Sequence, residues 1–237
     1  FENYIKAFTD TAYVQNMTAS LQQMIPQVLI IVFFSLFVAI ILRGEFKGRT
    51  LARSIFFLPV IISSGVVISV LKENVMLGAA AEAKQAAYMF QAPSFADTLS
   101  DLGLPVQVLN IFTQIINQLF DLTWKSGVQI LLLLAAVNNI PKSSYEVADI
   151  EGATEWEKFW KITFPLVSPT LLVAIIYTII DSFTDYGNKV MRMVTDQMSK
   201  GYYEYSSTLA YIYFVCVLII IGIVGFFMSR RVFYIAD

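Results

Sequence analysis

The first long apolar stretch of the chain, residues 24–42, reads MIPQVLIIVFFSLFVAIIL and contains no charged side chain. A helix needs about 20 predominantly apolar residues to cross the hydrocarbon core of a bilayer. Pro26 falls in the first turn, where its missing N–H is harmless because that donor has no partner within a helix. The stretch therefore predicts a transmembrane helix.

Four further apolar stretches repeat this pattern, at residues 54–71, 127–140, 164–180 and 208–228. The stretch at 127–140 is short, and it reaches spanning length only if its helix begins near residues 119–124. A buried or re-entrant segment is the alternative there. The whole chain is 57% hydrophobic and only 14% charged, whereas soluble domains have about a quarter charged residues. We predict an all-α, polytopic membrane helix bundle with about five transmembrane helices.

Composition also limits the chemistry that the chain can perform. There is no histidine, which removes the commonest general base and metal ligand. There is one cysteine, and the net charge of −2 gives no reason to expect a nucleic-acid partner. No Gly-x-x-x-x-Gly-Lys-[Ser/Thr] loop is present to bind the phosphates of a nucleotide. We expect no catalytic residue, metal site or cofactor in this chain, and hence no enzyme.

Positively charged side chains predict the orientation, because short cytoplasmic loops are enriched in lysine and arginine. They gather directly after the first and the last predicted spans, as Arg43, Lys47, Arg49, Arg53, Arg230 and Arg231. Both regions should be cytoplasmic. Alternation of five spans then places residues 1–23, 72–123 and 183–206 outside and residues 141–161 inside.

The chain is expected to form a single membrane domain over residues 1–237, without a separate soluble domain. The longest connection, residues 72–123, contains an alanine-rich stretch at 77–87 that favours a short helix. Residues 106–119 show helical spacing of apolar side chains and predict an amphipathic helix. The chain does not begin with Met, and we expect its natural N-terminus to lie upstream.

One predicted cytoplasmic segment, residues 141–165, differs from a simple connection. Ser143 and Glu146 have the spacing of a capping box, which predicts a helix from Ser144 to Glu151. Gly152 can adopt positive φ and end that helix. A second helix should begin near Thr154 or Glu155 and continue toward the next span. The result is a helical hairpin that could project from the bilayer; an amphipathic connector lying in the interface is the alternative.

The hairpin residues also resemble a known family. The run Glu146-Val-Ala-Asp-Ile-Glu-Gly-Ala, followed by Phe159, Ile162, Pro165 and Pro169, is similar to the EAA motif of binding-protein-dependent ABC importer permeases. Val147 replaces the alanine usual in the motif, and Glu151 replaces an aspartate. The segments Phe1-Glu-Asn-Tyr, Phe46-Lys-Gly-Arg and Phe57-Leu-Pro resemble permeases of the carbohydrate branch, of the maltose-permease kind. A first membrane helix expected from the family is absent from the chain.

This resemblance implies a multi-pass subunit of the bacterial plasma (inner) membrane. Its partners would be a second permease subunit, as a heterodimer, a cytoplasmic ATPase dimer that binds the ATP, an extracellular solute-binding protein, and membrane lipid. The hairpin would be the coupling element that docks on the ATPase, with Glu146 in a polar contact and Gly152 at the turn. The implied coupling residues are Tyr145, Glu146, Val147, Ala148, Asp149, Glu151, Gly152, Ala153 and Thr154.

Polar residues at the other end of the fourth predicted span are candidates for a substrate path, because polar groups inside spans are costly. They are Tyr177, Asp181, Ser182 and Asp185. The first three can share a helix face, and carboxylates accept hydrogen bonds from sugar hydroxyls. Contact with the binding protein, or solvation in the interface, are alternatives.

The resemblance therefore implies ATP-driven import of a sugar or oligosaccharide. A permease for a different solute and a membrane scaffold or channel remain alternatives. A channel should show repeated pore-lining polar residues along one span, and none is evident. An intramembrane enzyme would need paired carboxylates or a nucleophile with its base, whereas Asp181 alone lies near a span end in a suitable setting.

Overall fold

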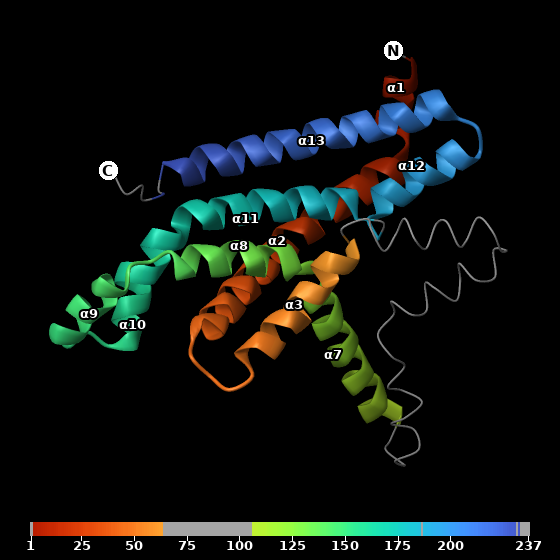
Figure 1. Ribbon diagram of the computed structural model, residues 1–237. Coiled ribbons are helices and arrows are strands. Elements are labelled where there is room, and N and C mark those ends of the chain that lie inside the picture. The colour runs from red at the N-terminus through yellow and green to blue at the C-terminus, as the bar shows by residue number, and fades with distance from the viewer. Residues whose placement is uncertain (1, 64–105, 186, 231, 233–237) are drawn as a thin grey trace. The chain divides into compact units, whose positions relative to one another are not determined.

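The computed structural model describes residues 2–63, 106–185, 187–230 and 232, and within these ranges the regular structure is helical, without a strand. Contacts between residues divide the chain into two units, Phe1–Arg43 with Leu132–Asp237, and Gly44–Leu131. The helices are labelled in Figure 1. Their bounds are α1 Glu2–Thr9, α2 Thr11–Arg43, α3 Arg49–Ser63, α7 Val106–Lys125, α8 Gly127–Asn138, α9 Lys142–Ile150, α10 Glu155–Lys158, the π-helix η1 Phe159–Thr163, α11 Phe164–Thr184, α12 Lys189–Ser199 and α13 Tyr203–Ser229.

In the first unit, a short helix and a long helix are joined at Asp10. The Asp10 carboxylate accepts hydrogen bonds from the backbone N–H groups of Ala12 and Tyr13, at 3.0 and 3.2 Å. These donors belong to the first turn of α2 and have no partner within the helix. Asp10 therefore acts as the N-cap of α2, and the chain changes direction there.

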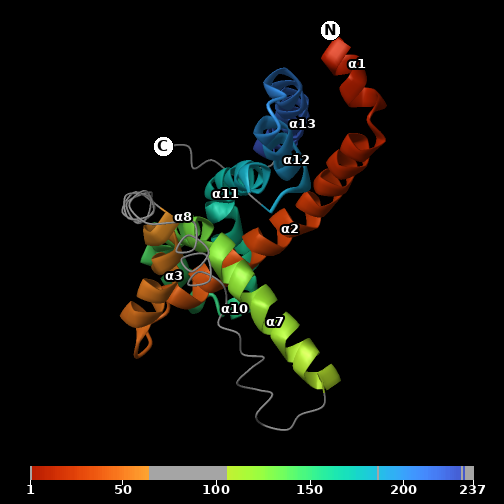
Figure 2. The ribbon, with the colours of Figure 1, turned by 90° about the vertical axis from the view of Figure 1, so that its right-hand side faces the viewer.

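The core of the first unit lies between α2, α11, α12 and α13. Helices α11 and α13 run alongside each other in Figure 1, and α12 lies against α13 in both views (Figures 1 and 2). The buried cluster contains Ala7, Tyr13, Met24, Val28, Val32, Ile179, Val190, Tyr205, Leu209, Ile212, Tyr213 and Val217. The apolar runs read from the sequence thus contribute one face of each long helix to this core.

Tyrosine hydroxyls tie the ends of these helices together. The Tyr13 hydroxyl donates to the backbone carbonyl of Leu209 over 2.7 Å, and the Tyr205 hydroxyl donates to the Asp10 carboxylate over 3.1 Å. The Asn188 side-chain amide donates to the Tyr213 hydroxyl over 2.6 Å. These bonds join residues on α1–α2 and on the α11–α12 connection to α13, which fixes the register of the helices.

Large apolar side chains remain exposed on α2 and α13. They include Leu29, Phe33, Phe37, Phe214, Leu218, Ile219, Ile223 and Phe227. Exposed apolar surface of this extent is unfavourable in water, whereas lipid accommodates it without cost. This surface supports the prediction of a membrane protein.

Within the described residues, three helical stretches are long and apolar enough to span a membrane: Thr11–Arg43, Glu155–Ser199 and Tyr203–Ser229. They contain the predicted spans at 24–42, 164–180 and 208–228. A fourth span is counted if Ile111–Lys125 and Gly127–Asn138, bent by 58°, cross together. The predicted span at 54–71 begins on α3, and its remainder lies outside the described residues. The described residues therefore contain three or four of the about five spans that the sequence predicted.

The second unit contains α3 and α7, which contact each other. Helix α7 confirms the amphipathic helix predicted at 106–119. It ends beside Ser126, whose hydroxyl hydrogen bonds to the carbonyl of Leu122. A serine that bonds back to the carbonyl four residues earlier often bends a helix, and the apolar run alone did not reveal this bend. The helix predicted at 77–87 lies outside the described residues.

The Tyr13 hydrogen bond gives a first testable prediction. Tyr13→Phe removes the hydroxyl but keeps the ring, and leaves the Leu209 carbonyl without this donor. We expect the free energy of unfolding in detergent to fall by about 1 kcal/mol. Thermal unfolding of the purified protein measures it. Tyr211→Phe is the matched control, because Tyr211 is exposed on the same helix as Leu209 and should change stability by less than half as much.

Candidate functional site

The predicted hairpin is present as α9 and α10, joined by a tight turn at Glu151–Ala153. The Ala153 N–H donates to the Ala148 carbonyl over 2.9 Å, and the Gly152 N–H donates to the Asp149 carbonyl over 3.1 Å. Gly152 has φ +74°. This pair of bonds around a left-handed residue is the Schellman motif, which satisfies the last carbonyls of a helix. Gly152 ends α9 as the sequence predicted.

The start of α9 differs from the prediction. The helix begins at Lys142 after Pro141, and no side chain caps its N-terminus. Ser143 therefore lies inside the first turn, and Glu146 is the fifth residue of the helix. The predicted capping box between Ser143 and Glu146 is wrong, because Pro141 already has the extended ψ of 135° of an N-cap residue and the helix starts two residues earlier than predicted.

A capping box does exist, at the start of α10. The Glu157 N–H donates to the Thr154 hydroxyl over 3.3 Å, and the Thr154 N–H donates to the Glu157 carboxylate over 3.0 Å. Glu157 lies in the charged stretch before the apolar part of the helix. The Thr154 N–H and the Lys161 ammonium hold the pKa of Glu157 at about 2. The carboxylate is therefore ionised at neutral pH, and the second helix begins at Glu155, directly after its N-cap Thr154, in agreement with the prediction.

Lys158 fastens the two helices of the hairpin together. Its ammonium pairs with the Asp149 carboxylate on α9 and, over 2.6 Å, with the Glu155 carboxylate on α10. The Lys158 side chain is only 9% exposed. The two carboxylates raise the pKa of Lys158, so this enclosed ammonium remains charged. The sequence analysis did not single out Lys158, although a lysine nine residues beyond Asp149 across a glycine turn could have indicated it.

A second contact joins the hairpin to the base of the next span. The Tyr145 hydroxyl lies 2.7 Å from the Thr163 hydroxyl, and Thr163 is buried in η1. The chain then continues without a break into α11, which starts at Phe164 and carries proline in its first turn. The hairpin is therefore held at its turn by backbone bonds, in its middle by Lys158, and at its base by Tyr145.

Most of the predicted coupling residues lie on the surface of this hairpin. Those classed as exposed are Glu146, Val147, Asp149, Glu151, Gly152 and Thr154, whereas Tyr145 and Ala153 are half-buried. Ala148 is 7% exposed and packs inside the hairpin. Ala148 is one of the implied coupling residues, but the helix turns its side chain inward, so it does not lie on the exposed face of the hairpin. The assignment of the other residues to a partner contact stays a prediction.

The most exposed apolar side chains of the hairpin were not among the predicted residues. Ile150 is 86% exposed at the end of α9, and Trp156 is 70% exposed on α10. Trp156 also begins a row of rings with Phe159, Trp160 and Phe164, with centroids 5.0 to 6.3 Å apart. The hairpin thus shows an apolar tip beside a charged rim, a surface suited to a protein partner.

The structure brings three of the four predicted substrate-path residues onto one helix. Tyr177, Asp181 and Ser182 lie on α11 and are half-buried, whereas Asp185 follows the helix as its C-cap. The Asp185 carboxylate accepts a bond from the Gly187 N–H over 2.7 Å. That bond shapes the turn into α12, so Asp185 has a structural role. The described residues do not test a substrate path.

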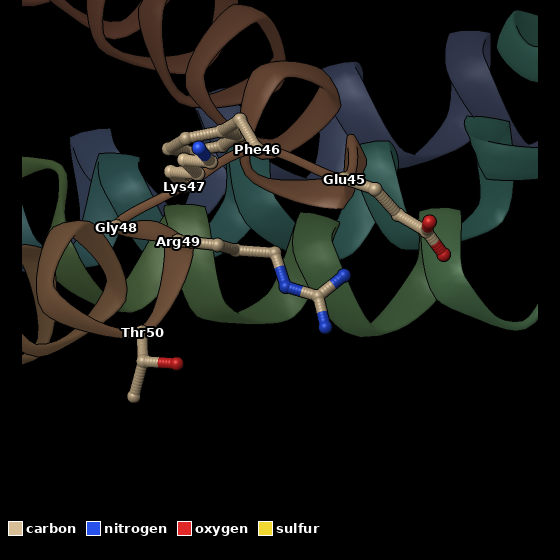
Figure 3. A pocket seen from close by; sticks show the side chains of 6 residues that line it. All are labelled: Glu45, Phe46, Lys47, Gly48, Arg49 and Thr50. Atoms are coloured by element: carbon tan, nitrogen blue, oxygen red, sulfur yellow. The ribbon is translucent and has the colours of Figure 1, made fainter.

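The loop before α3 forms a shallow, open hollow lined by Glu45, Phe46, Lys47, Gly48, Arg49 and Thr50. Figure 3 shows the Glu45 and Arg49 side chains extending away from the backbone of this loop. Gly48 has φ +93° and permits the turn. No group of three or more histidine, cysteine, aspartate or glutamate side chains within the described ranges could hold a metal ion.

Residues 17–235 match the family described as "Binding-protein-dependent transport system inner membrane component". The chain belongs to this family. It is accordingly an integral membrane component of a transport system, which agrees with the resemblance found in its sequence. The EAA motif itself is not tested by this match and stays a prediction.

Two relatives and one crystal structure illustrate the family. The chain is 24% identical to the "Probable ABC transporter permease protein YesP" of Bacillus subtilis. The alignment covers 98% of this chain and 77% of that relative. It is 34% identical to the "Trehalose/maltose transport system permease protein MalF" of Thermococcus litoralis, over 61% of the chain and 45% of that relative. The match thus extends over less than half the length of MalF.

The fold resembles that in the "Crystal structure of a bacterial ABC transporter involved in the import of the acidic polysaccharide alginate". The TM-score is 0.65 at 18% sequence identity, and the superposition covers 97% of this chain and 83% of the chain in the crystal structure. The all-α membrane bundle predicted from the sequence is therefore confirmed as the fold of an importer permease.

The left-handed glycine of the hairpin gives a testable prediction. Gly152→Ala places a Cβ on a residue with φ +74°, and no neighbouring atom lies near enough to oppose it. The cost is therefore one of backbone strain alone, and we expect it to destabilise the hairpin by about 1 kcal/mol. Hydrogen exchange of the α9 amides measures this change. Gly152→Asn, which tolerates left-handed backbone better, should exchange more slowly than Gly152→Ala.

The Lys158 ion pairs give another prediction. Lys158→Met keeps the aliphatic stem but leaves Asp149 and Glu155 as unpaired carboxylates close to each other. We expect several-fold faster exchange of the α9 amides, because nothing then fastens α9 to α10 at this point. Lys161→Met is the control: Lys161 is 73% exposed, and exposed pairs contribute little. Equal exchange rates in the two variants would show that Lys158 does not hold the hairpin closed.

Proposed function

We propose that this chain is the permease subunit of an ATP-driven importer and that the α9–α10 hairpin is the element that receives the force of ATP hydrolysis. The observation that carries the proposal is the apolar tip formed by Ile150 and Trp156 on a hairpin that is fastened at its turn, middle and base. A docking element must resist deformation, since a flexible loop would absorb the displacement of its partner.

The partner would be a cytoplasmic ATPase dimer that binds the ATP, because the chain itself has no phosphate-binding loop. Burying the Ile150 side chain in a groove of that partner would contribute about 2 kcal/mol. The exposed carboxylates of Glu146 and Glu151 would then lie at the rim, where they select the partner by charge. Residues 141–161 would accordingly face the cytoplasm, and the chain would act in the plasma (inner) membrane.

A second permease subunit, as a heterodimer, and an extracellular solute-binding protein complete the proposed assembly. The description of the family supports the binding protein. The lipid-facing side chains of α2 and α13 support contact with membrane lipid. The chain would hydrolyse nothing by itself.

The proposed cargo is a sugar or oligosaccharide. The printed names of MalF and of the alginate importer support this class. The half-buried Tyr177 and Asp181, one helical turn apart on α11, offer a ring face and a carboxylate of the kind that binds sugars. A permease for a different solute would use the same hairpin, so the cargo assignment and the coupling assignment are independent.

Ile150→Asp tests the docking role of the hairpin. Ile150 is exposed, so the substitution should leave the fold intact while placing a charge where a groove would close. We expect co-purification of the chain with its partner ATPase to fall at least tenfold, as expected for the loss of more than about 1.4 kcal/mol. A pull-down from membranes solubilised in mild detergent measures it.

Tyr202→Asp is the matched control for this experiment. Tyr202 is 62% exposed and precedes α13, at the opposite end of α11 and α13 from the hairpin (Figure 1). The Tyr202→Asp variant should co-purify with the ATPase as the unaltered chain does. Full association of the Ile150→Asp variant would contradict the coupling role and would favour a membrane scaffold without an ATPase partner.

A further inference from the structure

The cytoplasmic end of α2 contacts the hairpin through one side chain. Arg43 is the last residue of α2, and its guanidinium carbon lies 4.3 Å from the centroid of the Tyr145 ring on α9. This is a cation–π contact, and its geometry is within the range in which such contacts stabilise a structure. It joins residues about 100 positions apart in the chain, so it depends on the tertiary fold.

The same tyrosine continues the path on its other side. The Thr163 hydroxyl donates to the Lys158 carbonyl over 3.4 Å. The Thr163 hydroxyl oxygen also lies 2.7 Å from the Tyr145 hydroxyl oxygen, and either group can be the donor of that bond. The carbonyl lies five residues before Thr163, which is the spacing of the π-helix η1. Arg43, Tyr145, Thr163 and Lys158 therefore form an unbroken series of contacts.

This series connects the C-terminal end of α2 with α9 and η1, in addition to the packing of α2 against α11 and the Lys158–Asp149 ion pair. It begins on α2, crosses α9, and ends in η1 directly before α11. Lys158 then returns the series to α9 through its pair with Asp149. A displacement of the hairpin cannot change the position of Tyr145 relative to Thr163 or Arg43 without breaking one of these contacts.

We propose that Arg43 is a positioning residue for coupling, which makes the hairpin and the cytoplasmic end of α2 move as one body. The proposal rests on the coupling function proposed above and adds to it a second route of force. The direct route passes from the hairpin through η1 into α11. The second route passes from Tyr145 to Arg43 and into α2, so that ATPase closure would displace two spanning helices together.

Arg43→Met tests the second route in the assembled complex with its ATPase and solute-binding protein. The readout is the ratio of ATP hydrolysis with and without the binding protein, because this stimulation must pass through the permease. We expect the ratio to fall by about three- to fivefold, as for the loss of one partly exposed cation–π contact. Basal hydrolysis and co-purification with the ATPase should remain unchanged.

Three further variants show whether the contact or merely the charge matters. Arg43→Lys keeps a cation over the ring and should restore most of the stimulation. Lys47→Met removes a positive charge from the neighbouring loop (Figure 3) and should leave stimulation unchanged.

Tyr145→Phe keeps the ring but loses the bond to Thr163. The double variant with Arg43→Met should reduce stimulation no further than the stronger of the two single changes, because both residues act on one path.

Spin labels provide a measurement of the motion itself. Labels at Phe37→Cys on α2 and Glu151→Cys at the hairpin turn, in a Cys216→Ser background, report the distance between the two elements. We expect one narrow distance distribution that is the same without nucleotide and with ATP, magnesium and vanadate. Arg43→Met should broaden the distribution in both states.

Two results would overturn the proposal. Unchanged stimulation and an unchanged distance distribution in Arg43→Met would show that α2 moves without this contact. Loss of ATPase association in Arg43→Met would assign Arg43 to docking or folding instead. Failure of the coupling function is seen separately, as ATPase association that survives Ile150→Asp.

Discussion

Every polar group of the backbone must find a partner within the chain wherever lipid replaces water. This constraint accounts for the helical form of the described residues. Helices such as α2 and α13 satisfy their own N–H and C=O groups, and they can expose Phe37 or Phe227 to lipid without loss. At the ends of the helices, however, the first N–H groups and the last C=O groups have no partner within the helix. The side chains at these ends are accordingly polar: Asp10 caps α2, and Asn188 caps α12.

The hairpin shows how the same constraint is met outside the apolar core. Over a few residues the chain ends one helix with the Schellman bonds of Gly152 and starts another with the capping box of Thr154 and Glu157. All of these partners are local, so the turn needs no support from the rest of the molecule. The longer-range contacts of Lys158 with Asp149 and of Tyr145 with Thr163 then fix the position of α9 relative to α10 and η1. A compact rigid element results from a sequence that could also have formed a loose connector.

The sequence indicated the parts of the structure that depend on local residues. Apolar runs located α2, α11 and α13, because burial and lipid contact require such runs. Gly152 indicated the turn, because few other residues adopt its backbone conformation. The capping box was placed at Ser143 instead of Thr154, since both positions have the required spacing and only the conformation of Pro141 decides between them. The inward position of Ala148 was missed because a single helix face gives no indication of what packs against it.

Contacts between distant residues could not be read in this way. Nothing in the neighbourhood of Arg43 indicates an aromatic partner on α9, and a lysine in a charged stretch such as 155–161 is expected to face water. Lys158 differs because two carboxylates, one from each helix, enclose it. Pairings of this kind depend on how the chain folds back on itself, and an isolated pattern contains no information about that.

Under the proposed function, the arrangement would also separate the means of driving transport from the choice of cargo. Helix α11 has 21 residues and is therefore about 30 Å long. The hairpin joins one end of it, and Asp181 and Ser182 lie near the other. Among the described residues, the contacts named above for the hairpin do not include the half of α11 that lies away from it. Under the proposed function, changes near Asp181 would alter which solute is bound while the hairpin keeps its form, and one type of hairpin would serve permeases with different cargo.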